Sequence, residues 1–319
     1  MDPRFWRARN FPSDMSAKRE TVRPAPASLR SVEASKFPVP QHRAKRLGLN
    51  PAADPRNRPI GVFDSGIGGL TVLKALAEAN PREDFIYLGD TARLPYGTKS
   101  AEVILRYSLE NAGFLLARGI KMLVIACNTS SAVALDEIAS TTTIPVAGVI
   151  EPGARAVSRA SRSGKIGVIG TEATIASGAY TRAIKRFRPR AEVFTRACPL
   201  LVPLVEEGWT DNEIAERTVA HYLDSLKTSG IEALLLGCTH YPLLRSVFER
   251  VLGSGVKIVD SASATAAAVR ERLHALGLAR LRGAGRQSFF VTETPERFIR
   301  VGRRFLGPQV ESAVRIERW

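Results

Sequence analysis

Two stretches of this 319-residue chain place a cysteine directly after an apolar run. In LVIACNTSSA the cysteine is Cys127, and in LLLGCTHYPLL it is Cys238. Polar side chains and a predicted helix start follow both, and a helix N-terminus favours the thiolate form of a cysteine. One cysteine in such a place is usually a small buried apolar residue. Two in equivalent places indicate chemistry instead.

A pair of thiols suits the inversion of a carbon centre next to a carboxylate. One thiolate removes the proton from one face, and one thiol returns a proton to the other face. Such a carbon acid is weak, so the site must also supply hydrogen-bond donors for the developing negative charge. Asn128, Thr129 and Thr239 are candidate donors. The C-x-H spacing at Cys238 is a poor zinc pattern, and no metal is expected.

The elements that must position these residues alternate between apolar strands and helices. Strands are expected at 59–63, 84–88, 121–126, 144–149, 165–170, 191–195, 233–237 and 256–259. Helices are expected at 68–79, 101–118, 130–139, 177–187 and 211–227, and another is expected to end at 252. Continuous apolar strands alternating with helices predict parallel sheets covered on both faces. Ligands bind beyond the carboxyl ends of such strands, where both cysteines fall.

Three pairs of similar segments form an internal sequence repeat, which predicts two related halves. IGVFDS resembles IGVIGT, LVIACNT resembles LLLGCTH, and VAGVIEPG resembles VKIVDSA, in the same order along the chain. The spacings also match, because Ser65 and Cys127 are 62 residues apart, and Thr171 and Cys238 are 67 apart. The expected fold is therefore α/β, with two related doubly wound parallel-sheet domains facing each other across an active-site cleft.

Composition narrows the class of protein. The net charge is +15, but residues 1–59 hold 13 basic and 5 acidic side chains, so +8 lies in that segment and +7 in the rest. Nucleic-acid-binding motifs are missing, and no nucleic-acid partner is expected.

No apolar run reaches the ~18 residues of a membrane helix, so no membrane contact is expected. Three cysteines, an odd and sparse count, fit a reducing cytoplasm.

Residues 1–58 are rich in Pro and Arg, without periodicity, and are expected to be a disordered basic extension. The extension is acid-poor and Arg-rich, as transit peptides are, and Met15 is an alternative start.

Two further polar loops follow predicted strands. DSGIGGL places Asp64 and Ser65 before a glycine-rich turn, whose free N–H groups suit a carboxylate or phosphate. The G-x-G-G spacing lacks the last step of a dinucleotide fingerprint, so it does not predict a nucleotide. GDTARLPYGTKS offers the Tyr96 hydroxyl and the Gly97 backbone N–H to a ligand.

In combination these segments resemble the bacterial glutamate racemases of the aspartate/glutamate racemase family. The resemblance covers about residues 59–306 and includes VFDSGIGGLTV, YLGDTARLPYGTKS, GVIEPG, GVIGTEATI, CPLLVPLVEEG and FFVTETPERF beside the two cysteine segments. It implies a first domain from 59–151 plus 261–319 and a second from 152–260 inserted in it. The long extension departs from the family pattern.

The resemblance also implies roles. Cys127 would take the α-proton from D-glutamate with help from Asp64, and Cys238 would take it from L-glutamate with help from His240. An acidic residue near the site is implied in PLVEEG; Glu206 is expected, with Glu207 open. Cys198 is interpreted as structural. Substrate contacts are implied for Asp64, Ser65, Tyr96, Gly97, Asn128, Thr129, Thr171, Thr239 and His240.

The expected protein is thus a cytoplasmic isomerase that needs no cofactor and supplies D-glutamate for peptidoglycan. Its partner is a small molecule, glutamate; a homodimer, and a regulator contacting the extension, stay open. One alternative is a racemase of a related substrate, aspartate or a hydantoin. The other is a basic non-enzymatic binding protein whose cysteines only pack.

Overall fold

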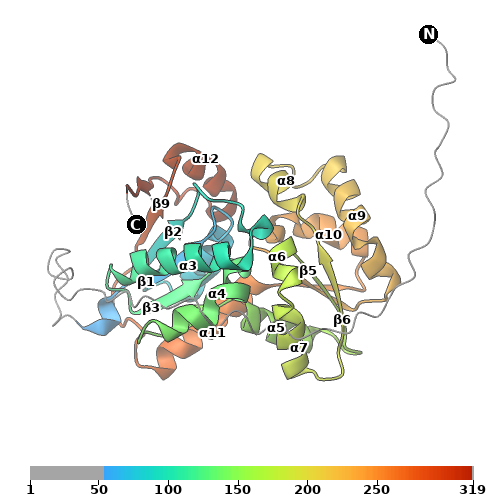
Figure 1. The fold of residues 1–319 in the computed structure, drawn as a ribbon, viewed down its shortest axis with the longest axis horizontal. Coiled ribbons are helices and arrows are strands. Elements are labelled where there is room, and N and C mark those ends of the chain that lie inside the picture. The colour runs from blue at the N-terminus through green and yellow to red at the C-terminus, as the bar shows by residue number, and fades with distance from the viewer. Residues whose placement is uncertain (1–53, 318–319) are drawn as a thin grey trace, which may run out of the picture. The chain divides into compact units, whose positions relative to one another are not determined.

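A computed structural model of the protein describes residues 54–317 (Figure 1). Most of the predicted disordered extension, residues 1–53, lies outside the described residues. The end of that prediction is wrong, because Pro55–Asn57 forms a short 3-10 helix in which the Asp54 carboxylate accepts from the Arg56 N–H.

The first sheet has six strands in the order β10-β9-β2-β1-β3-β4, and all neighbours are parallel. Its strands are β1 (Ile60–Asp64), β2 (Phe85–Gly89), β3 (Met122–Ile125), β4 (Val146–Gly148), β9 (Gln287–Val291) and β10 (Val314–Arg315). The helices connected to it are α2 (Leu70–Ala79), α3 (Ala101–Leu116), α4 (Asn128–Ser140), α5 (Ile150–Ala160), α11 (Ser261–Ala275) and α12 (Pro295–Leu306). The prediction assigned no element to the last two helices or to β9 and β10.

The second sheet has four parallel strands in the order β6-β5-β7-β8. Its strands are β5 (Lys165–Gly170), β6 (Glu192–Ala197), β7 (Ala233–Gly237) and β8 (Lys257–Asp260). The helices connected to it are α6 (Glu172–Ala176), α7 (Ala179–Phe187), α8 (Leu201–Glu207), α9 (Glu213–Thr228) and α10 (Arg245–Leu252), with the 3-10 helix η4 (Tyr241–Leu244) after β7. The 3-10 helix η3 (Tyr96–Thr98) follows β2 of the first sheet. The helix predicted over 177–187 corresponds to α7, which begins after Gly178 in the left-handed region, whereas α6 lies before that range and was not predicted.

The internal sequence repeat corresponds to a strand order that the two sheets share. The order β2-β1-β3-β4 in the first sheet repeats as β6-β5-β7-β8 in the second. Strands β1 and β7 are buried along their whole length, as expected for parallel strands with helices on both faces. The predicted α/β fold with two related parallel sheets is confirmed. The domain boundaries themselves stay a prediction.

A continuous apolar cluster joins the two sheets. It contains residues of α2 and β1 from one sheet and of α9, β7 and α10 from the other. Helix α11 leads from β8 back to β9 and packs against both α2 and α5. Within the described part of the chain, no helix has the length and apolar character needed to cross a membrane.

A buried ion pair lies before β3, at the end of the sheet away from the cysteines. Lys121 and Glu83 pair with side chains 1% and 4% exposed, and Lys121 Nζ also donates to the carbonyls of Arg56 and Leu278. A buried carboxylate is costly without its partner.

We expect Lys121→Met to lower the free energy of unfolding by about 3–5 kcal/mol, because it leaves the Glu83 carboxylate buried without its cation. Urea denaturation measures the change. Lys74→Met makes the same replacement at an exposed position of α2 and should change stability little. Equal stability of the two variants would contradict the assignment.

Candidate active site

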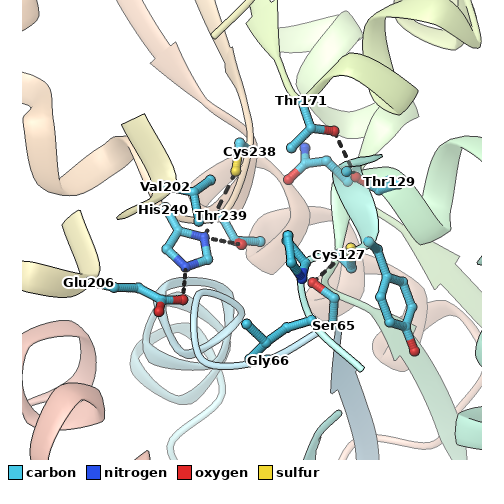
Figure 2. A pocket seen from close by; sticks show the side chains of 15 residues that line it. Ser65, Gly66, Cys127, Thr129, Thr171, Val202, Glu206, Cys238, Thr239 and His240 are labelled. Carbon is cyan, nitrogen blue, oxygen red and sulfur yellow. Dashed lines mark hydrogen bonds and ion pairs between the residues drawn. The ribbon is translucent and has the colours of Figure 1, made fainter. Parts of the chain in front are cut away.

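The carboxyl ends of strands from both sheets meet at one small pocket of about 30 Å³ (Figure 2). Every predicted site residue except Asp64 lines it. The full lining is Ser65, Gly66, Leu94, Pro95, Tyr96, Gly97, Cys127, Asn128, Thr129, Thr171, Val202, Glu206, Cys238, Thr239 and His240.

Cys127 follows β3 of the first sheet and caps the N-terminus of α4. Its Sγ accepts from the backbone N–H of Ser130 at 3.5 Å, and its thiol lies 3.6 Å from the hydroxyl oxygen of Ser65. Burial, together with the negative charge of Asp64, raises the pKa of the Cys127 thiol to about 11. This environment keeps Cys127 protonated near neutral pH.

Cys238 follows β7 of the second sheet and has a different neighbour. Its Sγ lies 3.9 Å from Nδ1 of His240, and Nε2 of His240 lies 3.2 Å from a carboxylate oxygen of Glu206 (Figure 2). Burial alone lowers the pKa of His240, but the interactions with Cys238 and Glu206 outweigh it and raise the pKa to about 10. His240 is therefore an imidazolium that lies beside the Cys238 sulfur.

The structure places Glu206, rather than Glu207, at the pocket. Glu206 is buried in the last turn of α8, whereas Glu207 is exposed. Burial raises the pKa of Glu206, but His240 and Arg297 outweigh that effect and hold the pKa below its usual range. Glu206 is thus a carboxylate paired with the imidazolium.

Asp64 lies behind the pocket, fully buried at the end of β1. Its carboxylate accepts from the Gly66 N–H at 2.9 Å and from the Thr239 hydroxyl at 3.5 Å. Burial raises the pKa of Asp64 despite these bonds. Asp64 thus holds the glycine-rich turn and acts on Cys127 through its charge. The roles of Asp64 in proton transfer and in substrate contact stay predictions.

The Tyr96 hydroxyl is committed within the protein. It donates to the carboxylate of Asp90 and accepts from Asn111 at 3.1 Å. Tyr96 also lines the pocket, and its predicted contact with the substrate stays a prediction. Gly97 lies so close to the second sheet that a Cβ there would be 2.6 Å from Cβ of Thr171.

Polar atoms gather on the wall formed by α4 and α6. The hydroxyls of Thr129, Thr171 and Thr174 lie within 2.9–3.0 Å of one another. Asn128 donates from Nδ2 to Tyr180 and to Ser261 at 2.6 and 3.3 Å. Its buried Oδ1 has no hydrogen-bond partner among the described residues, so it is an acceptor left for a ligand.

A second close approach lies at Gly68. A Cβ at this position would be 2.4 Å from ring atoms of His240 and from the Thr239 hydroxyl. Only glycine allows the turn after β1 to contact these residues of the second sheet. Thr71 extends the contact, since its hydroxyl donates to the Thr239 carbonyl at 2.9 Å.

Four pocket residues were not singled out from the sequence: Gly66, Leu94, Pro95 and Val202. Leu94, Pro95 and Val202 carry no chemical group that marks a site. Gly66 belongs to the turn that the sequence did identify, and its N–H is used by Asp64.

Known proteins share the sequence and the fold of this chain. The family model for Asp/Glu/Hydantoin racemase matches residues 60–269. Glutamate racemase of Geobacter metallireducens is 58% identical over 251 residues, which are 78% of this chain and 93% of that protein.

Two solved structures are also similar. Glutamate racemase from Thermus thermophilus in complex with β-chloro-D-alanine is 49% identical, with a TM-score of 0.75, over 83% of this chain and 98% of that one. The enzyme from Francisella tularensis in complex with D-glutamate is 39% identical, with a TM-score of 0.78, over 82% and 98%. The chain therefore belongs to the Asp/Glu/Hydantoin racemase family.

Proposed function

We propose that this chain is a glutamate racemase that interconverts L- and D-glutamate by proton transfer at two cysteines. The observation that carries the proposal is that Cys127 and Cys238 end equivalent strands of two related sheets and line one pocket. High identity to glutamate racemases over most of the chain supports the substrate.

The surroundings of the two thiols differ. Burial, together with the charge of Asp64, raises the pKa of Cys127 and keeps it a thiol, whereas Cys238 lies beside the His240 imidazolium. Cys238 would then remove the α-proton of L-glutamate, and Cys127 would deliver a proton to the opposite face. The reverse reaction needs the two protonation states exchanged.

The rest of the pocket would bind the substrate and stabilise the carbanion. Asn128 Oδ1 is suited to accept from the α-ammonium group. The hydroxyls of Ser65, Thr129, Thr171 and Thr239 are suited to donate to the two carboxylates and to the charge that develops beside Cα.

The pocket is closed in this structure. A volume of about 30 Å³ holds about two waters, since one water needs ~10–15 Å³ by the same measure. Glutamate has ten heavy atoms, so binding requires the walls to separate and close again. Because Gly68 and Gly97 are contact points between elements of the two sheets, we place this motion between the two halves, 59–151 with 261–319 and 152–260.

The product D-glutamate would serve peptidoglycan synthesis, and we expect the enzyme in the cytoplasm, in keeping with three free cysteines. A homodimer and a regulator that contacts the extension are part of the same proposal.

The proposal is tested with purified protein, without added pyridoxal phosphate, supplied side by side with L-glutamate, L-aspartate, L-alanine and a hydantoin in deuterated water. Circular dichroism and NMR at Cα measure inversion and exchange. Inversion of L-glutamate is expected. Exclusive turnover of L-aspartate or of the hydantoin would reject the glutamate assignment, and no exchange on any compound would favour a non-enzymatic protein.

Cys127→Ser and Cys238→Ser should each lower racemisation at least about 100-fold, because a hydroxyl is a far weaker acid and base than a thiol. Each variant should keep slow exchange at one face only. Cys127→Ser should place deuterium into L-glutamate alone, and Cys238→Ser into D-glutamate alone. Cys198→Ser, at a buried thiol outside the pocket lining, is the control. Full racemisation by either site variant would reject the two-thiol mechanism.

The pH dependence should follow His240 and Cys127. A raised pKa keeps the imidazolium protonated as pH rises, so kcat/KM should hold through neutral pH and fall only above about pH 10, where His240 and then Cys127 lose their protons. Glu206→Gln should move this alkaline limb to lower pH. Since the enantiomers have equal free energy, kcat/KM must match in both directions, which checks the measurement. An alkaline limb near pH 6.5 in the unaltered protein would contradict the assignment.

Gly68→Ala should lower kcat/KM by about tenfold or more, because its Cβ displaces the His240 ring and small misplacements of catalytic groups cost up to ~100-fold. Gly113→Ala is the matched control, since a Cβ there has open space. Steady-state kinetics and thermal unfolding together separate the site effect from stability. Wild-type kinetics in Gly68→Ala would show that the contact with His240 does not matter.

A further inference from the structure

Helix α12 reaches from the first sheet's half to the Cys238 side of the pocket. It follows β9, which pairs with β2 in the six-stranded sheet, yet it contacts α8, which follows β6 of the other sheet. Figure 1 shows α12 and α8 at neighbouring positions along the same edge of the molecule. No role for this helix was apparent from the sequence.

Three residues of α12 contact the Glu206–His240 pair. Arg297 Nη2 lies 2.9 Å from Oε2 of Glu206, and Arg304 Nη1 donates to the Glu206 carbonyl at 2.6 Å. The ring of Phe305 meets the His240 ring edge-on, with centroids 5.5 Å apart at 88°. Positions seven and eight residues apart lie on one face of a helix, so these contacts form a single surface.

Each oxygen of the Glu206 carboxylate therefore contacts a different cation. Oε1 lies 3.2 Å from His240 Nε2, and Oε2 pairs with Arg297. The Glu206 side chain is 9% exposed and that of Arg297 39%. A buried carboxylate with both oxygens engaged is held in one orientation. Without Arg297, one oxygen would lack its partner, and the carboxylate could turn away from the imidazole.

We propose that Arg297 is a positioning residue for racemisation, which fixes the Glu206 carboxylate so that His240 stays an imidazolium beside Cys238. The inference rests on the proposed function. The charged groups facing His240 are Cys238, Asp64 and Glu206, and Arg297 lies behind Glu206. One consequence is that the ion pair needs both halves of the chain, since its arginine belongs to the half opposite Glu206.

The test compares Arg297→Gln, Arg297→Lys and Arg300→Gln. Arg297→Gln should lower kcat/KM for both enantiomers about tenfold to a hundredfold, the factor for one charged hydrogen bond. Arg297→Lys, which keeps the charge, should recover most of the loss. Arg300→Gln is the matched control, because Arg300 is exposed on the same helix and shows no contact with Glu206. Thermal unfolding confirms that each variant is folded.

Two readouts separate positioning from a general structural effect. In a Glu206→Gln background, Arg297→Gln should cost no further activity, since it acts only through that carboxylate. The acid limb of the kcat/KM profile should move to higher pH in Arg297→Gln, because the guanidinium no longer holds the Glu206 pKa down. Histidine-ring NMR follows His240 in the same variants without substrate, and its signals should shift in Arg297→Gln and not in Arg300→Gln.

Wild-type activity in Arg297→Gln, or a loss that adds fully to that of Glu206→Gln, would overturn the proposal. These outcomes presuppose an active unaltered protein. An unaltered protein that racemises nothing would count against the proposed function instead, and the His240 signals would still report whether Arg297 positions the pair.

Discussion

The site depends on keeping a proton on the buried imidazole of His240. Burial alone would discharge His240, and the fold counters this with Glu206 on one ring nitrogen and Cys238 on the other. This imidazolium lies beside Cys238, whereas burial, together with the charge of Asp64, raises the pKa of Cys127 and keeps that thiol protonated. Two identical side chains thus become an unlike pair, as a reaction with one base and one acid requires.

The doubled topology explains how the two thiols come to one place. Each follows a strand that lies third in the same four-strand order, and the carboxyl ends of parallel strands are where loops and helix N-termini gather. The halves then differ in what surrounds each thiol. Cys127 caps a helix and lies near a carboxylate, whereas Cys238 precedes a 3-10 turn and lies near a cation.

Much of this was predictable from the sequence, for reasons of local pattern. Strands that are apolar along their length are readable, and residues just after them fall at the sheet edge, so Cys127, Cys238 and His240 were placed correctly. The sequence could not decide whether Glu206 or Glu207 lies at the pocket. That choice depends on which face of the short helix α8 packs against the half of the chain that contains α12.

The contacts that the sequence did not reveal share a physical cause. The Tyr96 hydroxyl donates to Asp90 within a folded loop, and no periodicity in the sequence predicts that bond. Arg297 is 91 residues from Glu206, in a helix that looks like an ordinary basic amphipathic segment. Apolar lining residues such as Leu94 and Val202 have no chemistry to mark them. Contacts that depend on tertiary packing could not be predicted from the sequence, whereas the positions of residues at strand ends could.

The central claim is that two thiols act on opposite faces of one bound amino acid. It is tested most directly by incubating the unaltered protein with L-glutamate in deuterated water and measuring Cα deuterium in both enantiomers during the first turnovers. The account predicts that D-glutamate carries deuterium from the start while the remaining L-glutamate keeps its protium. D-glutamate that retains the original hydrogen would mean that a single base carries the proton across, and would contradict it.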